Sequence, residues 1–177
     1  MDRDGTVSEE VGYMYHAGLY KVFSWTGPAI RRINQHGMKA VLITNQSGVG
    51  RGYFDELSVD EVHERLRAEL ALYSATLDGV YVCIHHPDAG CDCRKPNPGM
   101  LLQAQRDLDI DLARSFVIGD KYLDIETAHN VGAKGVLVLT GYGREEQRKH
   151  QADAMQPDLV ASNLMEAVDA ILRGVLP

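Results

Sequence analysis

The stretch KAVLITNQSGVGRG (Lys39–Gly52) changes character at its centre, and this change decides the class of fold. Its first part, KAVLIT (Lys39–Thr44), is apolar after the lysine, as expected of a strand that is buried on both faces. Asn45 and a glycine-rich turn follow directly. A buried strand that ends in polar residues is typical of parallel α/β sheets, which bind ligands at the carboxyl ends of their strands.

Further short apolar runs predict more strands along the chain. They are GVYVC (Gly79–Cys83), SFVIGD (Ser115–Asp120), KGVLVLT (Lys134–Thr140) and a short peripheral DLVA (Asp158–Ala161). Amphipathic stretches between them predict helices: one with a capping box at Ser58 and Glu61, one with Asn97 as N-cap, and a last one within Asn163–Gly174. Strands that alternate with helices imply a Rossmann-type three-layer α/β sandwich with a central parallel sheet.

Length and charge narrow the class of protein further. A chain of 177 residues without repeats or linkers suits a single domain spanning 1–177. The net charge of −7 argues against a nucleic-acid-binding protein, which needs clustered lysine and arginine. No apolar run approaches the length of a membrane span and no signal peptide is visible, so we expect a cytoplasmic protein.

All three cysteines of the chain lie between Cys83 and Cys93. Together with His85 they form two close pairs, Cys83-x-His85 and Cys91-x-Cys93, which supply three thiolates and one imidazole. This closed ligand set suits a structural Zn²⁺ with no catalytic role. The alternative, free buried cysteines, does not explain why every cysteine falls in this one loop.

Four short motifs carry the candidate chemistry. They are DRDGT (Asp2–Thr6), TNQSGVGRG (Thr44–Gly52), CRKPNPG (Cys93–Gly99) and GDKYLD (Gly119–Asp124). Each alone is weak, because paired aspartates are usually loop residues, glycine-rich runs are usually turns, and a lysine near a helix start usually lies at the surface. In this order, and near predicted strand ends, they indicate a shared site.

With these motifs the chain resembles the haloacid dehalogenase-like (HAD) phosphohydrolases that lack a large cap domain. The stretches TNQSGVGRGYF, CIHH and CDCRKPNPGML place it near the heptose bisphosphate phosphatases and histidinol-phosphate phosphatases of that family. The resemblance implies a Mg²⁺-dependent phosphomonoester hydrolase, and Zn²⁺ bound by the cysteine loop. We expect a monomer that binds a small phosphorylated metabolite and neither nucleic acid nor a membrane.

The resemblance also implies roles for single residues. Asp2 is the expected nucleophile, which forms an aspartyl-phosphate, and Asp4 the expected general acid and base. Mg²⁺ is expected on the Asp2 carboxylate, the Asp4 backbone carbonyl and Asp120. The remaining phosphate- or substrate-binding residues are Glu10, Val11, Gly12, Tyr13, Thr44, Asn45, Gln46, Ser47, Arg94, Lys95 and Lys121. Asp124 either joins them or only orients a neighbour such as Lys121.

The substrate implied by the resemblance is D-glycero-D-manno-heptose 1,7-bisphosphate, hydrolysed at its 7-phosphate. The interval between His85 and Cys91 is short, however, and closer to that of the histidinol-phosphate phosphatases, which makes histidinol phosphate the first alternative. Polynucleotide 3′-phosphatases carry similar motifs, but the acidic net charge disfavours them. An alternative of another class is a truncated, inactive, zinc-stabilised domain that binds a ligand or a partner.

Only Met1 precedes Asp2, although the family pattern has an apolar strand before the nucleophile. The sequence therefore predicts that the first strand is missing, through a late start or a fragment. Loss of that strand is expected to expose two strand edges and to leave Asp2 unfixed. We accordingly expect weak or no activity, which about five to seven further upstream residues, enough for an ordinary strand, would restore.

Overall fold

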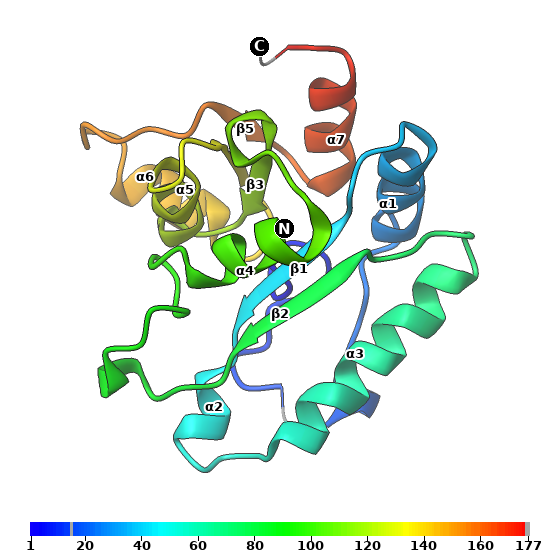
Figure 1. The fold of residues 1–177 in the computed structure, drawn as a ribbon, viewed down its shortest axis with the longest axis vertical. Coiled ribbons are helices and arrows are strands. Elements are labelled where there is room, and N and C mark those ends of the chain that lie inside the picture. The colour runs from blue at the N-terminus through cyan, green and yellow to red at the C-terminus, as the bar shows by residue number, and fades with distance from the viewer. Residues whose placement is uncertain (15, 176–177) are drawn as a thin grey trace.

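The structure, a computed structural model, describes residues 1–14 and 16–175. Helices and strands alternate along the chain, as the sequence predicts (Figure 1). The strands are β1 (Val41–Asn45), β2 (Gly79–Cys83), β3 (Phe116–Gly119), β4 (Lys134–Val138) and β5 (Leu159–Ala161). The α-helices are α1 (Thr26–Gln35), α2 (Ser47–Gly50), α3 (Glu56–Ala71), α4 (Gly99–Leu108), α5 (Tyr122–His129), α6 (Gly143–Lys149) and α7 (Leu164–Leu172). Short 3₁₀ helices span Ala17–Leu19, Pro87–Ala89 and Leu112–Arg114.

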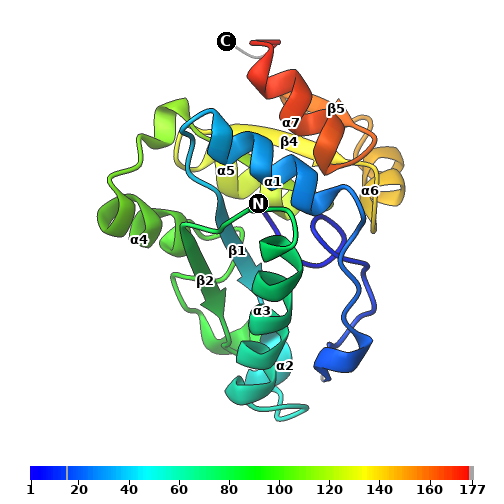
Figure 2. The same cartoon turned by 90° about the vertical axis from the view of Figure 1, so that its right-hand side faces the viewer.

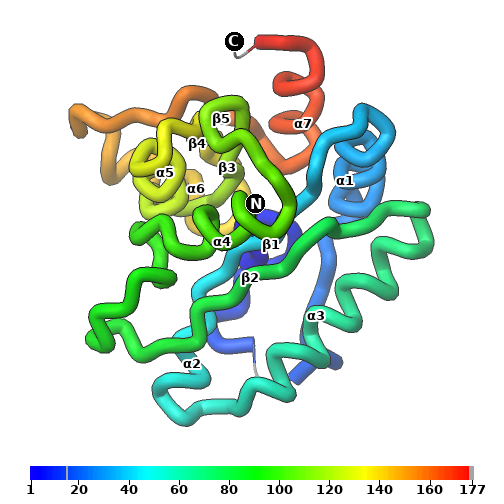
Figure 3. Tube along the Cα trace, in the orientation of Figure 1, coloured from blue at the N-terminus to red at the C-terminus, as the bar shows by residue number. Residues whose placement is uncertain are grey.

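The sheet consists of two parallel parts, β1-β2 and β3-β4-β5. Met1 and Asp2 lie between these parts and join them, since Met1 exchanges hydrogen bonds with Val41 and Ile43 (2.8 and 2.9 Å) and the Asp2 amide donates to Ile118 (2.9 Å). This is the pattern of a parallel ladder. Figure 3 shows the chain starting in the middle of the molecule, beside β1.

The position predicted for the first strand is thus taken by Met1 and Asp2, and among the described residues no strand is assigned before β1. The expectation that Asp2 is left unfixed is wrong. Its backbone is bonded to β3, its neighbour Met1 is bonded to β1, and its side chain is only 6 % exposed. Asp2, the nucleophile candidate, therefore lies between β1 and β3, where these two strands end.

Side chains that alternate along the strands build hydrophobic clusters on both faces of the sheet. Leu42 of β1 and Ile118 of β3 join the apolar residues of α1, α3 and α7. Their neighbours Ile43 and Val117 join those of α4 on the opposite face. Figure 2 shows α1, α3 and α7 together on the face turned to the viewer. The predicted three-layer sandwich is therefore confirmed.

Two predicted helix starts are wrong by a few residues. Helix α3 begins at Glu56, because the side chain of Asp55 accepts a hydrogen bond from the Ser58 amide (2.9 Å) and so acts as the N-cap. Helix α4 begins at Gly99, since Asn97 donates its side-chain amide to the Cys91 carbonyl (2.8 Å) instead of capping the helix. Helix α7 begins after Asn163, within the predicted range.

In residues 1–14 and 16–175 no separate domain is inserted between the strands, as expected for a fold without a large cap. None of the helices described there is long and apolar enough to cross a membrane.

Candidate active site

A cavity of about 320 Å³ opens where β1, β3 and the Met1–Asp2 segment end. Its position follows from the topology, because the carboxyl ends of parallel strands meet at one edge of the sheet. The cavity is lined by Asp2, Asp4, Glu10, Gly12, Tyr13, Thr44, Asn45, Gln46, Ser47, Gly48, Arg94, Lys95, Lys121, Leu123 and Tyr142. The structure therefore brings together residues from all four motifs.

Lys95 is the charged residue at the centre of this site. Its ammonium group is buried and lies 2.8 Å from Asp2 Oδ1 and 2.6 Å from Asp124 Oδ1. It also donates to the Ile43 carbonyl at 3.3 Å, so all three of its N–H groups are directed at protein atoms. Burial by itself would lower the pKa of Lys95, but the carboxylates of Asp124 and Asp2 raise it above the ordinary value.

Asp120 lies behind Asp2, and two glycines pack against its carboxyl group. Gly5 and Gly141 both have positive φ angles (80° and 51°), and a β-carbon on either would collide with Asp120 Oδ2. That oxygen accepts the Tyr142 amide (2.8 Å), while Oδ1 is buried and has no hydrogen-bond partner among the residues that the structure describes. Burial, and then the Asp2 charge, raise the pKa of Asp120 to about 8.

The Asp4 carboxyl group receives three hydrogen bonds. Arg3 donates to both of its oxygens (3.0 and 2.8 Å), and Gln46 donates to Oδ2 (2.9 Å). The same Gln46 amide also donates to the Thr44 hydroxyl (2.8 Å). Gln46, predicted as a substrate contact, thus links the acid–base candidate to the hydroxyl at the end of β1.

Asn45 lines the cavity, but its side chain is already engaged by the protein. It accepts the Lys95 amide through Oδ1 and donates to the Lys95 carbonyl through Nδ2, both at 3.1 Å. Asn45 therefore holds the backbone that carries Lys95 against the end of β1. Arg94 also lines the cavity, and its Nη1 is buried without a hydrogen-bond partner among the described residues, so this cation is not neutralised through that atom.

The predicted substrate segment Glu10–Tyr13 forms one wall. Glu10 accepts the Gly12 amide (2.7 Å) and pairs with Lys121 Nζ (3.1 Å), which anchors the segment to the start of α5. Tyr13 packs edge-to-face on Tyr53, with ring centroids 4.8 Å apart. Val11 is not part of the lining and is 48 % exposed, so the structure does not bring this predicted residue into the cavity.

Sequence reasoning missed Tyr142, which lines the cavity. Its amide binds Asp120, and its ring lies 4.6 Å from the Lys121 ammonium group. The signal that could have identified it is its position after the predicted strand Lys134–Thr140, at the same edge of the sheet as the other motifs. Gly48 and Leu123 were missed as well.

Three carboxyl groups, those of Asp2, Asp120 and Asp124, each offer an oxygen within 4.8 Å of the others and form what we call the carboxylate cluster. All three are buried, and Lys95 supplies the ammonium charge within hydrogen-bond distance of two of them. The unpartnered Oδ1 of Asp120 is suited to a hard cation. Mg²⁺ therefore fits these residues. Asp124 itself contacts Lys95 and the Lys121 amide (3.3 Å).

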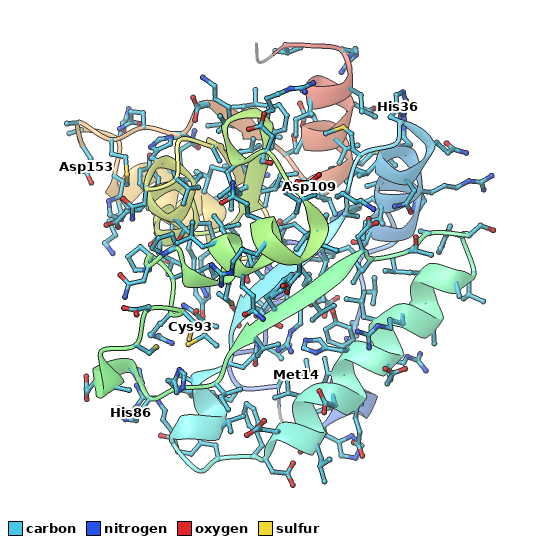
Figure 4. The ribbon with its side chains drawn as sticks, viewed as in Figure 1. Met14, His36, His86, Cys93, Asp109 and Asp153 are labelled. Carbon is cyan, nitrogen blue, oxygen red and sulfur yellow. The ribbon has the colours of Figure 1, made fainter. Side chains whose placement is uncertain are left out.

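Cys83, His85, Cys91 and Cys93 form a second group, which we call the thiol cluster. Figure 4 places Cys93 on the loop that follows β2, with His86 further out on the same loop. Cys91 Sγ lies 3.6 and 3.5 Å from the sulfurs of Cys83 and Cys93, and His85 Nδ1 lies 3.2 Å from Cys93 Sγ. Ligands of a tetrahedral Zn²⁺ are separated by about 3.5–3.8 Å. The two sulfur–sulfur distances and the 3.7 Å between Cys83 Sγ and His85 Nδ1 lie in this range and the His85–Cys93 distance is shorter, so zinc fits this cluster.

Comparisons with known proteins identify the family to which the chain is similar. The family model described as HAD-hydrolase-like matches residues 92–167. D-glycero-D-manno-heptose-1,7-bisphosphate 7-phosphatase of Thermosynechococcus vestitus is 38 % identical, over 100 % of this chain and 96 % of the relative. The D-glycero-beta-D-manno-heptose-1,7-bisphosphate 7-phosphatase of Escherichia coli K12 is 40 % identical, over 86 % of this chain and 84 % of the relative.

A solved structure has a similar fold over nearly the whole chain. D,D-heptose 1,7-bisphosphate phosphatase from B. bronchiseptica, complexed with magnesium and phosphate, superimposes with a TM-score of 0.91 at 33 % identity. The match covers 97 % of this chain and 96 % of that one. The corresponding enzyme from Burkholderia thailandensis gives a TM-score of 0.73 at 27 % identity, over 97 % and 95 % of the two chains.

Proposed function

The chain belongs to the heptose bisphosphate phosphatases of the HAD-like hydrolase family, and on this premise we propose that it removes the 7-phosphate of D-glycero-D-manno-heptose 1,7-bisphosphate. One observation carries the proposal. A single cavity contains the Asp2 carboxylate, the Asp4 carboxyl group, the Thr44 hydroxyl and the Lys95 ammonium group. These are a nucleophile, an acid–base group and two phosphate-binding groups.

Asp2 is the proposed nucleophile. Both hydrogen bonds to its carboxylate from the described residues, those of Arg3 N and Lys95 Nζ (both 2.8 Å), end on Oδ1. This leaves Oδ2 to attack phosphorus, which gives an aspartyl-phosphate. Asp4 protonates the leaving alkoxide and then takes a proton from the water that hydrolyses the aspartyl-phosphate.

The phosphoryl oxygens are bound by the groups around Asp2. Lys95 exchanges its bond to Asp2 for one to a phosphoryl oxygen and keeps its bond to Asp124, so it moves little on binding. The Thr44 hydroxyl already accepts a hydrogen bond from Gln46, so it donates a hydrogen bond to a phosphoryl oxygen. Arg94, Ser47 at the start of α2, and Lys121, the residue before α5, line the same cavity and bind the remaining phosphoryl oxygens.

Two metal ions complete the proposed enzyme. Mg²⁺ on Asp2, Asp120 and the Asp4 carbonyl would offset the charge repulsion between the phosphate dianion and the carboxylate nucleophile. Zn²⁺ in the thiol cluster would brace the loop that leads from Cys93 to Arg94 and Lys95.

We extend the proposal to the setting of the enzyme. A net charge of −7 supports a small phosphorylated metabolite as the partner in place of a nucleic acid. The free cysteines of the thiol cluster support a reducing compartment such as the cytoplasm. We propose that residues 1–177 act as one domain and as a monomer.

The test is a substrate panel. Heptose 1,7-bisphosphate and histidinol phosphate are compared in the presence of Mg²⁺ by phosphate release, and ³¹P NMR identifies which phosphate of the heptose is lost. We expect a higher kcat/KM on the heptose, with the 1-phosphate retained. Higher kcat/KM on histidinol phosphate, or loss of the 1-phosphate, would overturn the substrate assignment and leave the phosphatase mechanism standing.

A trapping measurement addresses the mechanism separately. Beryllofluoride mimics a phosphoryl group on an aspartate, so it should bind the wild-type protein with Mg²⁺ and not the Asp2→Asn variant. A protein that turns over none of the phosphomonoesters and binds no beryllofluoride would instead be the inactive ligand-binding domain that the sequence left open.

A further inference from the structure

Arg3 lies between the two catalytic aspartates in the sequence, and its side chain is buried in the protein. Its side chain is 1 % exposed, which is rare for an arginine. The guanidinium forms a fork on Asp4, with Nε 3.0 Å from Oδ1 and Nη2 2.8 Å from Oδ2. Burial of a charge is costly, so a buried arginine with this geometry needs a physical reason.

The surroundings of Arg3 fix the plane of its guanidinium. Nη1 lies 3.5 Å from His63 Nε2 of α3, and the Tyr20 ring centroid lies 5.8 Å from Cζ. Burial, with the charges of Arg3 and Arg67, lowers the pKa of His63 to about 3, so this imidazole is neutral at physiological pH. Because arginine can only donate, Nε2 of the neutral His63 ring accepts the hydrogen bond from the Nη1–H group.

The fork also specifies the orientation of the Asp4 carboxyl group. Oδ2 accepts both Arg3 Nη2 and Gln46 Nε2, whereas Oδ1 accepts only Arg3 Nε. A carboxylate offers about four lone-pair positions, two on each oxygen. Among the described residues, these contacts fill both positions on Oδ2 and leave one position on Oδ1 free for a proton. Asp4 itself lines the cavity.

We infer that Arg3 is a positioning residue for proton transfer, which acts by aiming the Asp4 carboxyl group at the leaving oxygen. This inference rests on the proposed function. As the bond from Asp2 to phosphorus forms and the bond from phosphorus to the leaving oxygen breaks, the Asp4 proton passes to that oxygen. Negative charge then appears on Asp4 beside the Arg3 guanidinium, where it is stabilised.

The experiment depends on how basic the leaving group is. An alkoxide needs protonation as it departs, whereas p-nitrophenolate leaves without it. The measured quantity is kcat/KM, since it reports the steps up to phosphoryl transfer and excludes hydrolysis of the aspartyl-phosphate. The substrates are p-nitrophenyl phosphate and the sugar phosphate that the wild-type protein hydrolyses best.

Arg3→Lys keeps the charge but cannot form the two-pronged contact. It should lower kcat/KM for the sugar phosphate about 10- to 100-fold, and for p-nitrophenyl phosphate less than about 3-fold, because only the general-acid contribution is lost. Asp4→Asn should show the same selectivity with a larger amplitude. If Arg3 acts through Asp4, adding Arg3→Lys to Asp4→Asn should leave the ratio of the two values unchanged.

Arg65→Lys is the matched control, because Arg65 forms an exposed pair with Glu69 (2.7 Å) on the same helix as His63. It should change neither value. The ratio of the two kcat/KM values does not depend on the active fraction, so a partly unfolded Arg3→Lys sample still reports. Arg3→Gln, which can still donate one hydrogen bond to Asp4, serves if the lysine variant does not fold.

Equal losses on both substrates would mean that Arg3 only supports the fold, and no loss on either would mean that it does not position Asp4. Both results overturn the inference while the wild-type phosphatase activity stands. Failure of the wild-type protein to hydrolyse the heptose would instead count against the proposed substrate, and the Arg3 comparison would then use another alkyl phosphate.

Discussion

The carboxylate cluster and the thiol cluster lie near the same edge of the sheet, but they are built in opposite ways. The thiol cluster comes from one loop, Cys83–Cys93, and only Cys83 of its ligands is buried. The carboxylate cluster combines Asp2 with Asp120 and Asp124, which lie more than a hundred residues away, and all three are buried. The thiol cluster is local in sequence and partly exposed to solvent, whereas the carboxylate cluster combines distant residues and is buried.

This difference suits the two clusters to different roles, the carboxylate cluster to catalysis and the thiol cluster to stabilising the fold. Burial raises the pKa of Asp120 to about 8 and that of Asp124 to about 6, which shows that the fold holds these carboxyl groups where ionisation is unfavourable. Such an environment is typical of functional sites. The thiol cluster has four ligands and no open position, which is typical of structural zinc. The two are connected, since Lys95 follows Cys93 by two residues.

The substitution Asp2→Asn should have the largest effect and tests whether the carboxylate cluster carries the chemistry. If the carboxylate cluster carries the chemistry, phosphate release should fall about 10⁴-fold or more, as for the loss of a nucleophile elsewhere. Thermal stability and zinc content should stay close to wild type, because the thiol cluster is untouched. Asp88→Asn is the control, since Asp88 is 88 % exposed on the zinc loop. Residual activity near wild type would remove Asp2 from the mechanism.

Removal of zinc should produce the next largest effect, and mainly on stability. Cys91→Ser, or a chelator, should lower the free energy of unfolding by about 4 kcal/mol at a zinc concentration a thousand times its Kd. Activity should fall with it, because the loop carrying Arg94 and Lys95 loses its brace. Metal analysis and thermal unfolding measure both. His86→Gln should retain zinc, and an unchanged melting temperature for Cys91→Ser would contradict a structural metal.

Acid should lower the stability of the fold through His63, which contacts Arg3 next to the carboxylate cluster. The folded-state pKa of about 3 lies below the unfolded value of 6.5, so the unfolded state takes up a proton first and stability is lost as pH falls from about 6.5 towards 3. His63→Gln should therefore lose about 2–3 kcal/mol less than wild type between pH 7 and pH 4. Denaturant unfolding at each pH provides the measurement, and parallel pH profiles would refute it.

Asn45→Ala should have the smallest effect. Asn45 connects the end of β1 to the backbone of Lys95, which follows the thiol cluster in the chain. The Asn45 side chain makes two hydrogen bonds to the Lys95 backbone, so its loss should cost about 1–2 kcal/mol of stability. We expect kcat to fall about tenfold or less, since the Lys95 side chain keeps its bond to Asp124. Zinc content should be unchanged. Loss of zinc would show that the strand end and the thiol cluster are one unit.

Much of the fold and the site could be predicted from local signals. The strands follow from short apolar runs, the helices from periodicity, and the thiol cluster from the spacing of Cys83, His85, Cys91 and Cys93. The convergence of the motifs follows from the rule that parallel strands end at one edge. The N-cap of α3 was misplaced because Asp55 and Ser58 are equally good capping residues by type, and only the backbone geometry selects Asp55.

The sequence by itself therefore determined the order of the elements, the ligands of the thiol cluster and the residue types of the active site, because each depends on neighbours within a few positions. Tertiary structure alone decided that Met1 and Asp2 join the two parts of the sheet, that Asn45 binds the Lys95 backbone, and that Arg3 turns inward onto Asp4. These contacts depend on how the backbone and the side chains are oriented, which is set by packing between segments that are distant in the chain.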